Sequence, residues 1–342
     1  MKTMTILSII TMSFLGLFSC KKDSNNSTSV AAPTSLTVTA TPSTDNSGNV
    51  AFVASATNAT TYDYDYGDGT FQTVASGAVT YKYSTSGTYT VNVIAKNAGT
   101  ATISKSVQVT VTVVATTFWS EEFNTDGAPD PAKWSYELGA GGWGNNELQY
   151  YTARPENSIV QGGVLKIKAI RESYNGSNFT SARLVSKGKF AFKYGRVDIS
   201  AKLPAGVGTW PALWMLGSNI SSAGWPNCGE IDIMEHLGRD LNKIYGTLHY
   251  PGHSGGNANG GTTVISGATT AFHKYSLDWS ATAIKIYVDD VLYHTVANSN
   301  AIPFNQDFFF ILNIAMGGDF GGPVDASVNG ATMEVDYIRV YK

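Results

Sequence analysis

The chain has 342 residues, a formal net charge of −3 and only 14% charged residues, and it is rich in glycine and tyrosine. Its length suggests two domains or slightly more, and its charge excludes a broad cationic surface for nucleic acid. The composition favours a secreted all-β protein over a helical cytosolic one.

The N-terminal segment has the features of an export signal. An apolar run from about Met4 to Phe18 follows a lysine and is too short to cross a bilayer comfortably. Its end, Leu-Phe-Ser-Cys at 17–20, resembles a bacterial lipobox, in which the cysteine becomes a lipidated N-terminus. We therefore expect a signal peptide over 1–19, a lipidated Cys20 and attachment to the outer membrane or cell surface. Secretion after cleavage of an ordinary signal is the alternative.

Two segments follow before the larger part of the chain. Residues 20–33 are polar and aperiodic, which is typical of a flexible linker. Residues 34–114 contain short alternating strands separated by Gly, Asn and Ser, a pattern that indicates a small β-sandwich. The run Tyr-Asp-Tyr-Gly-Asp-Gly at 64–69, with Gly-Thr-Tyr-Thr-Val at 87–91, resembles the PKD domain, an immunoglobulin-like module.

The acidic and aromatic residues of this PKD-like region allow two interpretations each. Asp63, Asp65 and Asp68 could suggest a calcium loop, but Gly67 occupies a ligand position and favours a turn. The alternate residues Tyr62, Tyr64 and Tyr66 could stack on sugar rings or form one packed face, and packing is the preferred interpretation. We expect a spacer module, with weak sugar affinity as the alternative.

Residues 117–342 contain many strand-like runs and few helical periods. Asp289 and Asp290 lie between two such runs and predict a hairpin turn. Many strands without helices predict two antiparallel sheets packed face to face.

The run Glu-Ile-Asp-Ile-Met-Glu at 230–235 is the most informative stretch. In a regular strand Glu230 and Asp232 share one face, whereas Glu235 points to the other. A β-bulge near Ile233 or Met234 would return Glu235 to the face of the other two acids. An ordinary amphipathic strand with a solvated face is the alternative.

In its context this run closely resembles the motif of glycoside hydrolase family 16, Glu-x-Asp-x-(x)-Glu on a strand of a β-jelly roll. The extra residue, here Met234, is typical of laminarinase-like members, whereas licheninases characteristically lack it. Supporting motifs are Trp-Gly-Asn-Asn-Glu-Leu-Gln-Tyr-Tyr at 143–151, Gly-Thr-Trp-Pro-Ala-Leu-Trp at 208–214, Gly-Thr-Leu-His at 246–249 and Asn-Ile-Ala-Met-Gly-Gly at 313–318. The resemblance covers 117–342 and implies a concanavalin A-like jelly roll after the immunoglobulin-like sandwich.

The resemblance also implies catalytic roles. Glu230 would be the nucleophile and Glu235 the general acid and then base, with Asp232 tuning Glu230. Their carboxyls would lie about 5 to 5.5 Å apart, as in retaining glycosidases. Such crowding raises one pKa and would keep Glu235 protonated near neutral pH.

Further residues are assigned to the cleft and to a possible metal. Family counterparts of Trp210, Trp214, Asn145 and Arg183 line the cleft, and core packing is the alternative for each tryptophan. Trp225 is a further candidate sugar platform, and His249 is either a cleft residue or a structural histidine. The mechanism requires no cofactor, but a structural calcium ion is implied at Glu122, Gly163 and Asp336, with surface carboxylates that hold no ion as the alternative. Cys228 is expected to be a buried core residue rather than a nucleophile.

We therefore expect a monomeric, retaining endo-β-1,3-glucanase that acts on laminarin-type β-glucan outside the cytoplasm and binds no nucleic acid. Alternative substrates are mixed-linkage β-glucan or a galactan. A surface protein that binds carbohydrate without hydrolysis is the alternative from another class, disfavoured because all three motif carboxylates are present.

Overall fold

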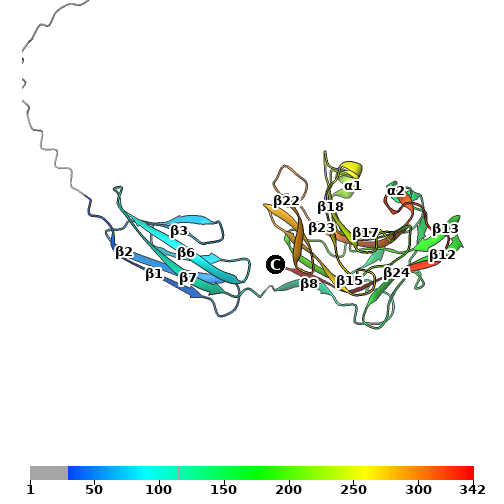
Figure 1. Cartoon of the computed structure of the whole chain (residues 1–342), viewed down its shortest axis with the longest axis horizontal. Coiled ribbons are helices and arrows are strands. Elements are labelled where there is room, and N and C mark those ends of the chain that lie inside the picture. The colour runs from blue at the N-terminus through cyan, green and yellow to red at the C-terminus, as the bar shows by residue number, and fades with distance from the viewer. Residues whose placement is uncertain (1–29, 115) are drawn as a thin grey trace, which may run out of the picture. The chain divides into compact units, whose positions relative to one another are not determined.

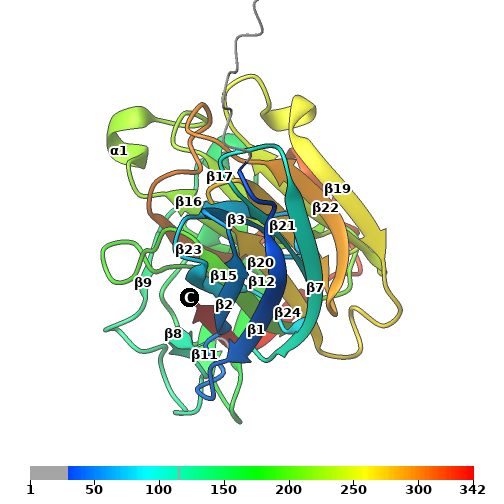
Figure 2. The ribbon, with the colours of Figure 1, turned by 90° about the vertical axis from the view of Figure 1, so that its left-hand side faces the viewer.

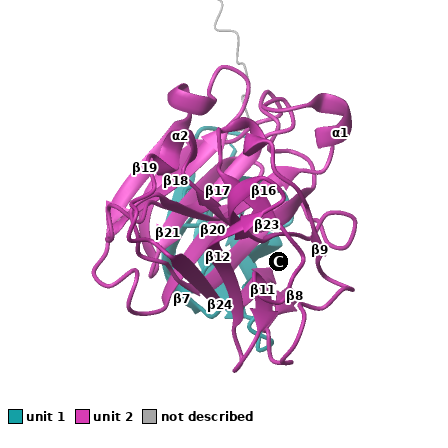
Figure 3. Cartoon of the chain, turned by 90° about the vertical axis from the view of Figure 1, so that its right-hand side faces the viewer, with its two compact units in different colours: residues 1–114 teal, residues 115–342 magenta. Residues whose placement is uncertain are grey.

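The computed structural model describes residues 30–114 and 116–342, and the chain divides into two compact units at Val114 (Figures 1 and 3). The predicted signal peptide and Cys20 lie outside the described residues. Strands dominate both units, so the expected all-β class is confirmed. Across the described ranges, no helix has the length and apolarity needed to cross a membrane.

The first unit is a sandwich of two antiparallel sheets. One sheet has the order β1 (Thr34–Pro42), β2 (Asn49–Thr57), β5 (Ala78–Lys82). The other has the order β4 (Phe71–Val74), β3 (Thr61–Asp65), β6 (Gly87–Lys96), β7 (Thr102–Val111). Ala31, which lies in the expected linker, already accepts a hydrogen bond from Asn97 Nδ2 at 2.7 Å.

The tyrosines of β3 and the following turn form the core of this sandwich. Tyr62, Tyr64 and Tyr66 are at most 6% exposed and belong to its buried cluster, so the packed-face interpretation is confirmed. The turn interpretation also holds, because Asp65 Oδ1 accepts the Gly67 N–H and Asp68 Oδ1 accepts the Thr70 N–H. These carboxylates therefore stabilise the turn between β3 and β4.

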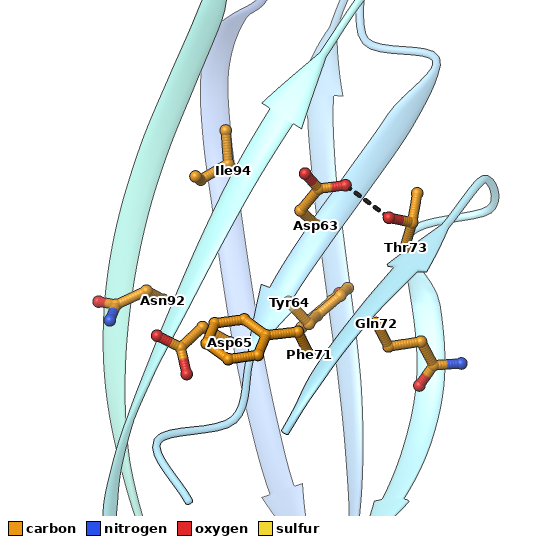
Figure 4. A pocket seen from close by; sticks show the side chains of 8 residues that line it. All are labelled: Asp63, Tyr64, Asp65, Phe71, Gln72, Thr73, Asn92 and Ile94. Carbon is orange, nitrogen blue, oxygen red and sulfur yellow. Dashed lines mark hydrogen bonds between the residues drawn. The ribbon is translucent and has the colours of Figure 1, made fainter. Parts of the chain in front are cut away.

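A shallow depression of about 480 Å³ lies on the outer face of the four-stranded sheet (Figure 4). Asp63 accepts a hydrogen bond from Thr73 and pairs with Lys96, and Asn92 Oδ1 accepts one from Ser106. Phe71 is 71% exposed beside them. Because the polar groups bind one another, the depression has the character of a solvated sheet face.

The second unit is a larger sandwich whose two sheets have seven and ten strands. The seven-stranded sheet has the order β19 (Asn259–Val264), β18 (Lys243–His249), β17 (Glu230–His236), β16 (Thr209–Gly217), β23 (Phe308–Met316), β14 (Arg183–Val185), β9 (Ser135–Tyr136). The main path of the ten-stranded sheet is β10 (Gln149–Tyr151), β13 (Ser177–Ser181), β12 (Leu165–Tyr174), β24 (Gly330–Tyr341), β15 (Gly195–Lys202), β20 (His273–Trp279), β21 (Ala283–Val288), β22 (Val291–Ala297). Off this path, β11 (Ser158–Val160) pairs with β12, and β8 (Thr117–Glu121) pairs with β24.

The inner faces of these sheets bury one apolar core, and every residue of β23, an interior strand of the seven-stranded sheet, is buried. At one side of the sandwich the edge strands β19 and β22 lie side by side (Figure 2). The predicted hairpin joins β21 to β22, where Asp289 and Asp290 both have positive φ, as a tight hairpin turn requires. Among the described residues, four short helical turns lie in loops of the second unit: η1 (Gly142–Gly144), α1 (Ile220–Ala223), η2 (Gly255–Asn257) and α2 (Gly318–Gly321).

Candidate active site

Strand β17 contains the predicted bulge. Asp232 pairs with Trp214 of β16 and Thr247 of β18, and Glu235 pairs with Ala212 and Tyr245 of the same two strands. Between these pairs the chain advances three residues along β17 but only two along each neighbouring strand. The consecutive side chains of Ile233 and Met234 both pack into the core. This extra inward-facing residue returns Glu235 to the face of Glu230 and Asp232, where all three line one cleft.

Each acid of the triplet has its own partners. Glu230 Oε2 accepts the indole N–H of Trp225 at 3.1 Å. Glu235 accepts the indole N–H of Trp210 at 3.0 Å and the hydroxyl of Thr247 at 3.1 Å. Asp232 is 3% exposed, and its Oδ2 has no hydrogen-bond partner among the described residues.

Burial dominates the protonation of the triplet. It raises the pKa of Glu230 to about 8, reinforced by the charge of Asp232 and opposed by His249. Burial likewise raises the pKa of Asp232 well above its ordinary value, with a further contribution from Glu235. The pKa of Glu235 is raised by burial and opposed by the hydrogen bond from Trp210. The three carboxyls therefore keep protons to higher pH than exposed ones do.

His249 lies in the cleft, with Nε2 at 3.2 Å from Asp232 Oδ2 and 3.6 Å from Glu230 Oε1. These three side chains place potential ligand atoms within 4.8 Å of one another. However, His249 Nδ1 accepts the Gly255 N–H at 3.2 Å, which assigns the proton of the neutral ring to Nε2. A protonated Nε2 cannot bind a metal, so this arrangement favours an electrostatic contact between the His249 ring and the carboxylates over metal binding.

The cleft above β17 has a volume of about 880 Å³. All six residues predicted to bind substrate line it: Asn145, Arg183, Trp210, Trp214, Trp225 and His249. Trp210 and Trp214 are partly exposed on its floor, while Trp225 is 49% exposed in the loop before β17. Aromatic walls with a few polar groups are the usual lining of a sugar site.

Arg183 is held between two tryptophans. Its guanidinium carbon lies 4.9 Å from the ring centre of Trp143 and 4.7 Å from that of Trp214. Its Nε donates to Glu137 Oε2 at 2.7 Å. The cation and the two rings together form one wall of the cleft.

Sequence reasoning missed several residues of the cleft. Glu147 and Asn313 lie in motifs that resemble the family, but no role was expected for them. Thr247 contacts Glu235, and Tyr245 packs edge-on against Phe320, which also packs edge-on against Trp210. The signal for Thr247 is its place in the Gly-Thr-Leu-His motif, two residues before His249.

The remaining predicted residues lie elsewhere. Cys228 is a fully buried free cysteine, and burial raises the pKa of its thiol to about 11, so the core interpretation is confirmed. None of Glu122, Gly163 and Asp336 lines the cleft. Gly163 lies two residues before the first residue of β12, Leu165, which pairs with Val335 of β24, so register brings Gly163 near Asp336. Both carboxylate oxygens of Glu122 bind Arg339, at 2.9 and 2.8 Å.

The raised pKa of Glu230 predicts a stability that depends on pH. The folded state holds this proton up to about pH 8, whereas the unfolded chain releases it near 4.5. This carboxyl therefore stabilises the fold at low pH, and that stability is lost as the pH rises from 4.5 through 8. Because Glu230→Gln removes the titration, we expect its melting temperature to exceed that of the wild type more at pH 8 than at pH 5.

Thermal melts of both proteins at the two pH values test this expectation, with the exposed Glu156→Gln as a matched control. A difference between variant and wild type that is the same at pH 5 and pH 8 would contradict it.

Comparison with known proteins agrees with this geometry. The profile of Glycosyl hydrolases family 16 matches residues 145–339, and that of the PKD domain matches residues 23–111. A beta-glucanase of Rhodothermus marinus is 48% identical over 240 residues, covering 66% of this chain and 84% of the relative.

Two solved structures are similar to the second unit. The laminarinase from Rhodothermus marinus has a TM-score of 0.65 at 47% identity, over 67% of this chain and 98% of its own. The catalytic domain of an endo-1,3-beta-glucanase (laminarinase) from Thermotoga petrophila has a TM-score of 0.63 at 43% identity, with the same coverages. The family profile spans more than half of the chain. The chain therefore belongs to glycosyl hydrolase family 16.

Proposed function

We propose that this glycoside hydrolase is a retaining endo-β-1,3-glucanase acting on laminarin-type polysaccharide. The observation that carries the proposal is the bulged strand β17, which places Glu230, Asp232 and Glu235 together at the base of an aromatic cleft. The similarity to a beta-glucanase and to two laminarinases supports the choice of substrate.

The proposed reaction has two displacements. Glu235 donates its proton to the glycosidic oxygen, that bond to the anomeric carbon breaks, and the Glu230 carboxylate forms a new bond to the same carbon. Glu235, now ionised, removes a proton from water, whose oxygen attacks the anomeric carbon and releases Glu230. Each displacement inverts the carbon once, so the configuration is retained, and no cofactor is required.

The hydrogen bonds of the two glutamates suit these roles. The Trp225 indole N–H and the nearby His249 stabilise the ionised form of Glu230, while burial and the neighbouring charges favour a proton on the triplet. Asp232 lies between the two glutamates along β17 and adjusts the ionisation of Glu230 through its charge. Burial nevertheless raises the pKa of Glu230 to about 8 in the free protein, so this carboxyl must lose its proton before it attacks, whereas Glu235 must keep one.

Reducing ends released from laminarin, lichenan, agarose and carrageenan, measured side by side, test the proposal. We expect laminarin to be cleaved fastest, with the first product carrying the β-anomeric configuration in a freshly recorded NMR spectrum. Preference for lichenan would indicate a mixed-linkage glucanase, and preference for agarose or carrageenan a galactanase. Binding without release of reducing ends would indicate a carbohydrate-binding protein instead.

We also propose a structural calcium ion held by Glu122, the Gly163 carbonyl and Asp336. Oxygen ligands of this kind suit calcium, but the ion would compete with Arg339 for Glu122. Calcium that binds only the folded state should add about 2.7 kcal/mol of stability at a hundredfold excess over Kd, and so raise the melting temperature. Melts with calcium and with EDTA should differ in the wild type and coincide in Asp336→Asn, and coincidence in the wild type would contradict the proposal.

For the cellular location we propose a lipid anchor at Cys20 that holds the enzyme outside the cytoplasm. The lipobox-like Leu-Phe-Ser-Cys run is its support. Cys20→Ser should move the enzyme out of the membrane fraction, and an unchanged distribution would favour an ordinary secretory signal.

A further inference from the structure

Four residues of the cleft region form a continuous chain of hydrogen bonds that ends on the indole of Trp214. We propose that Glu147, Tyr151 and Asn313 are positioning residues that orient Trp214 for binding of the glucan chain. We call these three residues and Trp214 the relay. This inference rests on the proposed function, because it assigns Trp214 to the binding of that substrate.

The chemistry of the groups permits only one donor-to-acceptor direction for the hydrogen bonds of the relay. An indole N–H can only donate, so Asn313 presents its Oδ1 to Trp214 Nε1, at 2.8 Å. The amide nitrogen of Asn313 then donates to the Tyr151 hydroxyl oxygen at 2.9 Å. That hydroxyl donates onward to Glu147 Oε2 at 3.0 Å. Each group is therefore held in one orientation by the groups on either side of it.

Glu147 is a fixed end for the relay. It is 8% exposed and also accepts hydrogen bonds from Gln149 Nε2 at 2.6 Å and Asn145 Nδ2 at 3.3 Å. Gln149 is itself fully buried, and its Oε1 accepts the Met316 N–H at 2.7 Å. A carboxylate at one end strengthens the neighbouring hydrogen bonds by polarising them. Burial holds the pKa of Tyr151 well above its ordinary value, so the hydroxyl remains a donor.

The relay connects the two sheets of the second unit. Tyr151 is in β10 of the ten-stranded sheet, whereas Asn313 and Trp214 are in β23 and β16 of the seven-stranded sheet. Tyr151 is fully buried and Asn313 is 4% exposed, so water cannot readily replace the missing partner when either group is removed. Loss of one hydroxyl in the relay therefore affects the orientation of a side chain on the other sheet.

Trp214 is well placed to convert this orientation into substrate affinity. Its ring stacks on Arg183 in the cleft wall, and its backbone pairs with Asp232 across β16 and β17. The relay contacts none of the three acids by hydrogen bond, so its loss should change binding of sugar more than the chemical step. The expected signature is a raised KM with little change in kcat.

The kinetic test uses Tyr151→Phe, Trp214→Phe and the double variant, with laminarin as substrate. Tyr151→Phe should raise KM about 2- to 10-fold, the size expected for one hydrogen bond, and change kcat less than about twofold. In the Trp214→Phe background the same change should have no further effect on KM, because the indole N–H is already absent. If the KM increases of the two single variants multiply in the double variant, the two residues act independently and the proposal is overturned. Tyr136→Phe, a half-buried tyrosine whose hydroxyl faces Ser158, is the matched control and should leave KM unchanged.

A second measurement is independent of substrate. The indole N–H signal of Trp214 is assigned in a ¹H–¹⁵N spectrum as the signal lost in Trp214→Phe. Tyr151→Phe should shift that signal and Tyr136→Phe should not, and an unmoved signal would overturn the relay. Absence of laminarin cleavage by the wild-type enzyme would instead refute the proposed function. If Tyr151→Phe does not fold, Asn313→Asp replaces it, because Asp accepts from Trp214 but cannot donate to Tyr151.

Discussion

Replacing Glu230 or Glu235 by glutamine is expected to reduce turnover of laminarin by about 10³-fold or more while the fold is preserved. Glutamine has nearly the shape of glutamate, but it can neither attack the anomeric carbon as an anion nor donate a carboxylic proton. Each substitution therefore removes one chemical role from β17 without opening a cavity. Reducing-end assays and thermal melts of both variants measure the two quantities.

The two variants should also differ from each other. A substrate with a good leaving group, such as a dinitrophenyl glycoside, needs no proton to depart, so Glu235→Gln should form the glycosyl-enzyme intermediate from it rapidly. Glu230→Gln should remain inactive on every substrate. The exposed Glu156→Gln serves as the control. Near wild-type turnover of laminarin by either active-site variant would eliminate the assignment.

Replacing Phe310 by alanine is expected to lower the stability of the second unit by about 3 to 5 kcal/mol. Phe310 is 1% exposed in β23, and the centre of its ring lies 5.9 Å from that of Trp119 and 5.8 Å from that of Phe192. The substitution removes buried apolar surface and leaves a cavity that the surrounding strands cannot fill.

Urea unfolding followed by tryptophan fluorescence measures this loss selectively, because every tryptophan of the chain lies at or after Trp119. Phe310→Leu, which keeps much of the volume, should cost less than about 1.5 kcal/mol. Equal losses for the two variants would show that the site is not packed as described.

The sequence predicted the features of the site that depend on neighbours along the chain. Glu230 and Glu235 are five residues apart, so alternation required an extra residue between them, and the structure has it at Ile233 and Met234. Trp210 and Trp214 are four apart and were expected on one face, where both line the cleft. Local periodicity was sufficient for these cases because a strand fixes the direction of each side chain.

Other features depend on strand pairing between distant segments and could not be predicted in this way. The contact of Trp214 with Asn313 spans 99 positions, and that of Asn313 with Tyr151 spans 162. The stack of Trp143, Arg183 and Trp214 likewise requires segments from three parts of the chain. Periodicity gives no information on register between such segments. For the same reason, His249 was left between two interpretations until its neighbours Asp232 and Glu230 were located.

The bulge in β17 also determines which insertions and deletions this segment can accept. Five positions separate the two glutamates here, and the bulge compensates for that odd number. A lineage that lost one codon between Asp232 and the second glutamate could straighten the ribbon and still aim both acids at the sugar. Loss of two codons from the bulged strand would leave the two glutamates three residues apart. This spacing is still odd, so a bulge would still be required. Single-codon changes at this point are therefore the ones that selection for hydrolysis can tolerate.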